Sequence, residues 1–149
     1  MDLHTLEFLY RYGAWVLFFV ICGWAFWRGG KTERIAAAIT VVSWGIGLLT
    51  LPLDNYRPGP FSVAIDVATL ICYGWLAIRS RRIWVFFITA ANVNTLITHF
   101  IAKWLHLGAY GYITVLGVWG SYAPLICLGV GMWGYQRAKK RAAIAAAQT

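Results

Sequence analysis

Of the 149 residues, 60% are hydrophobic and only 12% are charged, whereas about a quarter of the residues in a typical soluble domain are charged. This composition excludes an ordinary soluble domain and predicts an all-α, polytopic membrane bundle that forms a single domain. The net charge of +8 does not predict nucleic-acid binding, because the basic residues lie between apolar runs, where membrane topology places them.

Five apolar runs follow one another along the chain, separated by short polar segments. The segment RGGK closes the first run, the proline-containing segment LDNYRPGP follows the second, and the basic turn RSRR ends the third. Proline and glycine favour turns at such boundaries. The expected transmembrane spans are residues 8–27, 35–52, 61–78, 83–106 and 112–135, followed by a basic cytoplasmic tail at residues 136–149 that extends as a helix into water.

The basic residues alternate between the two ends of these spans. Residues 28–34, 79–82 and 137–141 hold three, three and four Lys or Arg, whereas the three connections at the other end hold one, one and none. Because cytoplasmic connections are enriched in Lys and Arg, we expect the N-terminus outside and the C-terminus in the cytoplasm. The residues expected at lipid headgroups are Arg79, Arg81, Arg82, Arg137, Lys139, Lys140 and Arg141.

Tryptophans support this topology, since their rings favour the membrane interface. We expect Trp44 in the core and the others named here at the interfaces: Trp24, Trp27, Trp75, Trp84 and Trp133 on the cytoplasmic side and Trp104 on the outer side.

The fourth span carries polar residues close to one face of its helix. Such groups usually face other protein or a water-filled cavity. Reflection about the turn at residues 80–81 places Asp66 of the third span level with residue 95, because both helices rise equally per residue. We therefore expect an intramembrane polar cluster, which is either hydrogen-bonded structural packing or a functional polar site. Its members are Asp66, Asn92, Thr95, His99 and Lys103.

His99 and His106 are the candidate cofactor ligands. They lie seven residues apart on one helix, about 10 Å along its axis, so they cannot both bind one haem iron. His99 alone could ligate a haem or a bacteriochlorophyll. Neither a metal-binding motif nor a catalytic motif is present, so the sequence requires no cofactor and does not predict an enzyme.

Small residues recur at a spacing of four, which lets helices approach closely. The pattern predicts helix packing, within the bundle or against another subunit. The residues concerned are Ser43 and Gly47 in the second span, Ala64, Ala68 and Cys72 in the third, and Ala123, Cys127 and Gly131 in the fifth.

The stretch from Asp66 to His99 has an early Asp in one span, a basic turn, an aromatic start to the next span and a late His. In these features residues 60–106 resemble a group of small alphaproteobacterial membrane proteins. Those relatives often have Trp-Pro after the turn, where this chain has Trp84-Val85. The resemblance implies a bacterial inner-membrane setting.

We expect a non-catalytic accessory or assembly subunit of a larger inner-membrane complex, respiratory or photosynthetic, because catalytic motifs are absent and small-residue stripes suit subunit contacts. Its expected partners are the lipid bilayer and either other membrane subunits or further copies of itself. The first alternative is a small oligomeric transporter or channel that uses Asp66, Asn92 and His99. The second is a haem- or pigment-binding protein with His99 as ligand.

Overall fold

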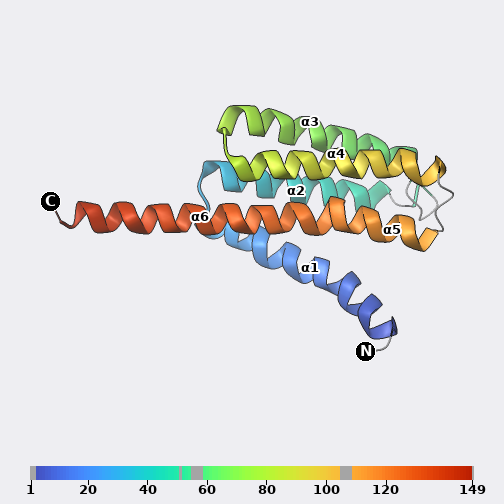
Figure 1. The fold of residues 1–149 in the computed structure, drawn as a ribbon, viewed down its shortest axis with the longest axis horizontal. Helices are drawn as coiled ribbons and strands as arrows, with labels where there is room; N and C mark the ends of the chain where they lie inside the picture. Colours follow the sequence, from blue (N-terminus) through green and yellow to red (C-terminus); the bar gives the residue numbers. More distant parts are fainter. Residues whose placement is uncertain (1–2, 51, 55–58, 105–108, 149) are drawn as a thin grey trace.

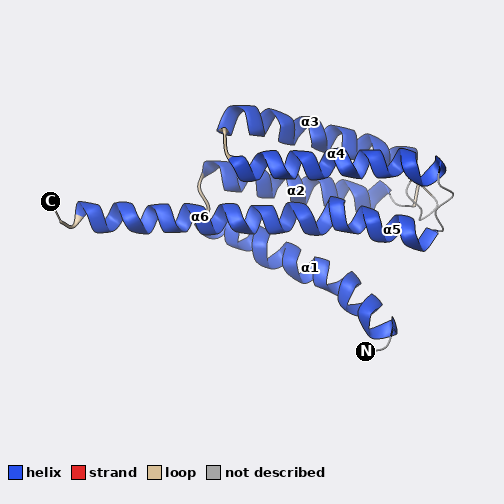
Figure 2. Ribbon diagram, viewed as in Figure 1, coloured by secondary structure: helices blue, strands red, loops and turns tan. Residues whose placement is uncertain are grey.

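The computed structural model describes residues 3–50, 52–54, 59–104 and 109–148, although the side chains of 3–11, 102–103, 109–110 and 112–113 are not described. Every regular element in these ranges is helical (Figure 2). The elements are α1 (Leu3–Arg28), α2 (Lys31–Thr50), α3 (Pro60–Ser80), α4 (Ile83–Trp104), α5 (Ala109–Gly117), the π-helical turn η1 (Val118–Tyr122) and α6 (Ala123–Ala146).

Four of the helical segments are long and apolar enough to cross a membrane: Lys31–Thr50, Pro60–Ser80, Ile83–Ile101 and Thr114–Ala146. The part of α1 whose side chains are described, Tyr12–Arg28, is a shorter apolar helix, and the whole of α1 has 26 residues. The expected all-helical class is therefore confirmed, and four helices have the length and apolar character to cross a membrane.

The helices form an elongated bundle in which successive connections lie at opposite ends (Figure 1). Helix α3 packs against α2 and α4, α4 packs against α6, and α1 packs against α2 and α6. The α1–α2 connection, the α3–α4 turn and the extension of α6 all lie at one end (Figure 1), which we call the basic end. The end of α2, the start of α3, the end of α4 and the start of α5 lie at the opposite end, and α1 diverges from the bundle toward the N-terminus (Figure 1).

Helices α1 and α2 begin before the expected spans, α1 at Leu3 instead of residue 8. Helix α2 begins at Lys31 instead of residue 35, because Glu33 of its first turn is buried and forms an ion pair with Arg82 at 3.3 Å. The helix of the last expected span continues past residue 135 to Ala146, which agrees with the expected helical tail. The segment Thr114–Ala146 has 33 residues and is about 50 Å long at 1.5 Å per residue. It therefore exceeds the roughly 30 Å hydrocarbon thickness.

Pro124 explains the π-helical turn between α5 and α6. Its ring nitrogen has no hydrogen to donate to the carbonyl four residues earlier, and its ring crowds that carbonyl. The backbone N–H of Ala123 instead bonds to the carbonyl of Val118, five residues back. The helix thus continues through the proline with one wide turn, the usual form of a π-bulge.

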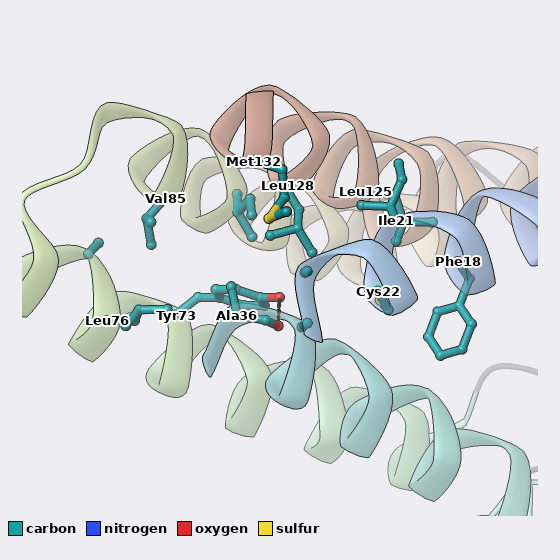
Figure 3. Close-up of a cluster of buried hydrophobic side chains, with 14 residues drawn as sticks. Phe18, Ile21, Cys22, Ala36, Tyr73, Leu76, Val85, Leu125, Leu128 and Met132 are labelled. Atoms are coloured by element: carbon teal, nitrogen blue, oxygen red, sulfur yellow. Dashed lines mark hydrogen bonds between the residues drawn. The ribbon is translucent and has the colours of Figure 1, made fainter. Parts of the chain in front are cut away.

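The close-packed core lies mainly in the half of the bundle at the basic end. Leu76 of α3, Val85 of α4, and Leu128 and Met132 of α6 are all buried there (Figure 3). Toward the other end, Phe18 stacks on Trp44 with ring centroids 4.5 Å apart. The expectation of Trp44 as a packing residue agrees with this contact.

The small-residue stripes have different surroundings. Gly131 is buried under the Trp84 ring, which a Cβ at position 131 would meet at 2.5 Å, so this glycine does permit α4–α6 packing. In α2, the Ser43 hydroxyl bonds to Thr69 of α3 at 2.7 Å. Ala123 and Cys127 are half-buried. In contrast, Ala64, Ala68 and Cys72 are exposed along α3.

Candidate functional site

An ion pair or neutral hydrogen bond joins α3 and α4 in the half of the bundle away from the basic end. The Nε2 atom of His99 lies 2.7 Å from Oδ2 of Asp66. The His99 side chain is only 3% exposed, whereas that of Asp66 is 28% exposed. The reflection about the α3–α4 turn thus predicted a proximity that the structure contains, and the contact is short enough to share or transfer a proton.

Hydroxyl pairs connect α2 and α3 along the adjacent side of the bundle. The Tyr73 hydroxyl lies 2.6 Å from the Thr40 hydroxyl and donates to the Ala36 carbonyl at 2.9 Å, as Figure 3 shows for Tyr73 and Ala36. Ser43 pairs with Thr69 about one turn farther toward Asp66. These interhelical bonds fix α2 against α3 and leave polar atoms along one inner face.

A cavity of about 350 Å³ lies among α2, α3, α4 and the η1 turn. This volume is near the lower limit of the roughly 300–1,000 Å³ found for small-molecule sites. Apolar walls are supplied by Trp44, Ile65 and Leu116. The cavity is bordered by many hydrogen-bonding side chains, namely Thr40, Ser43, Ser62, Asp66, Thr69, Tyr73, Asn92, Thr95, His99 and Ser121.

The predicted cluster is therefore mostly present, but its members bond differently from one another. Asp66, Asn92, Thr95 and His99 all line the cavity. The Asn92 amide donates to the Ile88 carbonyl at 2.9 Å, and the Thr95 hydroxyl donates to the Ala91 carbonyl at 3.1 Å. The Asn92 side-chain carbonyl and the Thr95 lone pairs can still accept hydrogen bonds from a ligand. The Lys103 side chain and His106 lie outside the described residues.

The η1 turn supplies a wall that sequence inspection missed. Gly120 and Ser121 of this turn border the cavity, as does Gly117 at the end of α5, and a Cβ on Gly120 would lie 3.5 Å from the Thr95 side chain. The sequence signal for this turn was Pro124, which cannot donate a hydrogen bond to the carbonyl four residues earlier and so widens the turn.

His99 is engaged in a way that bears on cofactor binding. A metal at Nε2 would have to displace Asp66 from its 2.7 Å contact. Within the described ranges, no three His, Cys, Asp or Glu residues are grouped so as to hold a metal ion. Cys22, Cys72 and Cys127, all described, form no disulfide. The haem or pigment hypothesis on His99 and His106 stays a prediction.

A second charged contact lies at the basic end. The Glu33 side chain is completely buried, and its Oε1 lies 3.3 Å from Nη1 of Arg82, which is 42% exposed. The other carboxylate oxygen, Oε2, has no hydrogen-bond partner in the described part of the chain. Sequence inspection placed Arg82 at lipid headgroups, but part of its guanidinium group serves this internal carboxylate.

Asp54 organises the start of α3 at the opposite end. Its carboxylate accepts hydrogen bonds from the backbone N–H groups of Gly59, Phe61 and Ser62 and from the Ser62 hydroxyl. Desolvation raises the pKa of Asp54, but the bonds from Ser62, Phe61 and Gly59 outweigh it, so the pKa lies below its usual value. A carboxylate at a helix N-terminus is also favoured by the helix dipole.

Comparisons with protein-family models, with curated proteins and with solved structures found no match.

Proposed function

We propose that this protein is a small transporter or channel whose cavity binds a small polar solute together with a proton. In this proposal the chain crosses a bacterial inner membrane five times, with the N-terminus outside. The basic end then faces the cytoplasm, since cytoplasmic connections are enriched in Lys and Arg, and the Asp66–His99 pair lies in the outer half of the bundle.

The observation that carries the proposal is the 2.7 Å contact between His99 and Asp66 in the wall of a largely apolar cavity that is also bordered by hydroxyl and amide groups. Ionisable groups at membrane depth are costly and commonly mark substrate or proton pathways. A carboxylate and an imidazole that share one proton can exchange it when a solute binds. The carboxylate form of Asp66 would favour a solute that donates hydrogen bonds. Binding of such a solute would therefore release the shared proton or transfer it to His99.

Proteoliposomes that contain a trapped pH-sensitive dye test this proposal directly. Guanidinium, urea, glycine and glycerol would be added outside in turn, with a membrane potential of either sign. We expect at least one solute to change the internal pH. We expect Asp66→Asn to lower that response by an order of magnitude or more, because the amide can no longer exchange the proton.

Two threonines of α4 provide matched controls. Thr95 and Thr98 are both buried, and each donates to the carbonyl four residues earlier, but only Thr95 borders the cavity. Thr95→Val should weaken the response, whereas Thr98→Val should leave it unchanged. An unchanged response in Asp66→Asn, or no response to any solute in the wild-type protein, would contradict the proposal.

The accessory-subunit function is the second candidate, and one observation favours it. The stripe Ala64, Ala68 and Cys72 is exposed on α3, and Ala68 and Cys72 border an apolar groove of about 370 Å³ between α2 and α3. Small residues on a lipid-facing surface suit close contact with a helix of another subunit. Replacing Ala68 with Leu should release larger partners that co-purify in mild detergent, whereas purification without stoichiometric partners would contradict this function.

A further inference from the structure

A basic groove lies at the junction of α1, α2 and α6, at the basic end of the bundle, whereas the Asp66–His99 contact lies in the other half. Its volume is about 490 Å³. Arg28 ends α1, Arg34 lies in the first turn of α2, and Lys139 and Lys140 lie on the extension of α6, and all four border the groove. Gly29, Tyr135, Gln136 and Trp27 contribute to its walls.

The groove is built by specific contacts between its helices. The side-chain amide of Gln136 donates to the Arg28 carbonyl at 2.6 Å and so ties α6 to the end of α1. A Cβ on Gly30 would meet the Tyr135 ring at 2.8 Å. A glycine at position 30 therefore allows the start of α2 to approach α6.

The charge of the groove is uniformly positive. Of the described residues that line it, four are basic and none is acidic. The carboxylate in the first turn of α2, Glu33, pairs with Arg82 instead. The N-terminus of α2 adds a partial positive charge of the same sign. Four like charges around one concavity repel one another unless an anion occupies it.

We propose that this groove binds the phosphate of an anionic phospholipid. A phosphate diester matches the set of guanidinium and ammonium donors, since Arg presents a planar fork and Lys a point charge. Basic pockets between helices on the cytoplasmic side of membrane proteins are suited to anionic headgroups.

The surroundings favour a lipid over a free phosphate ion. The groove lies where an apolar helix passes into an exposed polar extension, and the exposed Trp27 ring forms part of its wall. Arg28 stacks on Trp27 at 4.6 Å from the ring centroid, and Arg137 stacks on Trp133 at 3.8 Å. Such Trp–Arg pairs fit the membrane interface. Exposed apolar residues of α1 and α6, such as Phe26 and Val130, offer surfaces for the acyl chains.

This proposal differs from a general attraction between a basic tail and the membrane. The sequence expectation treated Arg137, Lys139, Lys140 and Arg141 alike, but only the two lysines line the groove. Arg28 and Arg34 were not in that expectation at all.

The test compares two double variants that remove the same charge from the same helical extension. The full-length protein would be purified, delipidated and mixed with phosphatidylglycerol or phosphatidylcholine, and bound lipid would be counted by native mass spectrometry. Lys139→Gln/Lys140→Gln should reduce the affinity for phosphatidylglycerol on the order of thirtyfold, because each lysine beside the headgroup contributes a factor of about five. Arg137→Gln/Arg141→Gln should reduce it less than about twofold, since neither side chain lines the groove.

Arg34→Gln is an independent variant outside the tail and should also lower phosphatidylglycerol occupancy. Circular dichroism and gel filtration would show that each variant folds. Equal losses in the two double variants would overturn the proposal in favour of diffuse attraction. Equal retention of phosphatidylcholine would overturn it too, and displacement of the lipid by millimolar inorganic phosphate would identify a site for soluble anions instead.

Discussion

The two halves of the bundle use their interior in opposite ways. At the basic end, Leu76, Val85, Leu128 and Met132 are almost wholly buried against one another (Figure 3). In the other half, the corresponding space between helices is a cavity whose apolar walls also carry hydrogen-bonding side chains. Lipid supplies no hydrophobic drive for helix association, so close packing has to hold the helices together. The packed half thus maintains the fold, and the hollow half is free to carry a site.

Polar groups occur in both halves but differ in how they are satisfied. Tyr73 and Thr40, at the boundary, bond to each other and to the backbone of α2. Asp66 and His99 bond to each other while Asp66 keeps an exposed face in the cavity. Substitutions should therefore affect stability strongly in the packed half and solute binding in the hollow half.

The largest loss of stability should follow Arg82→Ala. This change leaves the buried Glu33 carboxylate without its described partner. Breaking a wholly buried ion pair costs about 3–5 kcal/mol. Because Arg82 is 42% exposed, water already screens part of the interaction, and we expect about 2–3 kcal/mol in the free energy of unfolding, measured by denaturant titration in micelles.

The double variant Arg82→Ala/Glu33→Gln controls for the loss of the arginine itself. Glutamine has nearly the same shape as glutamate but carries no charge, so most of the lost stability should return. A double variant as unstable as Arg82→Ala would show that the uncompensated carboxylate is not the cause.

Leu128→Ala should have the next largest effect, because it opens a cavity in the packed half. Leu128 is 1% exposed, whereas Ile126 on the same helix is 55% exposed. Leu→Ala in a core costs about 2–5 kcal/mol, and we expect about 2 kcal/mol here because lipid chains solvate the separated helices. Ile126→Ala should cost less than about 1 kcal/mol. Equal effects on the denaturation midpoint would show that the half at the basic end is not closely packed.

How far the sequence predicts this molecule depends on the range of the interaction involved. The pairing of Asp66 with His99 was predictable, because a short turn forces α3 and α4 into an antiparallel hairpin and fixes which residues are level. The contacts of α2 with α3, such as Tyr73 with Thr40, were not predictable, because a longer connection leaves the rotation of α2 open.

The exposure of Ala64, Ala68 and Cys72 was likewise not predictable, since a stripe of small residues does not indicate which helix packs against it. The burial of Glu33 depends on Arg82, 49 residues later, a contact that no local pattern reveals. The π-helical wall had a local cause in Pro124, but the sequence does not distinguish a wide turn from a kink.

Tyr73→Phe tests the boundary between the halves. The variant removes a hydroxyl that bonds to Thr40 and to the Ala36 carbonyl, but Thr40 keeps its own bond to Ala36. Interhelical hydrogen bonds in membranes contribute about 0.6 kcal/mol on average, so we expect a loss of about 0.5–1 kcal/mol. Tyr73 also borders the cavity, so the solute response should change as well, which distinguishes it from Leu128→Ala.

The smallest and most local effect should be a pH dependence of stability that arises from Asp54, in the hollow half of the bundle. Its pKa is lowered in the folded protein, so its carboxylate stabilises the start of α3 above the unfolded value of about 3.9, and that contribution is lost as pH falls through the folded value. Thermal unfolding midpoints measured from pH 6 to pH 3 should therefore fall more steeply for the wild-type protein than for Asp54→Asn, because the amide does not titrate. Leu128 is packed at the basic end, remote from this cap. The steeper fall should therefore coincide with lower protection factors for amide hydrogen exchange at Phe61 and Ser62, while the protection factor at Leu128 stays constant. Parallel pH profiles for the two proteins would mean that the capping bonds at Gly59, Phe61 and Ser62 do not depend on the charge of Asp54.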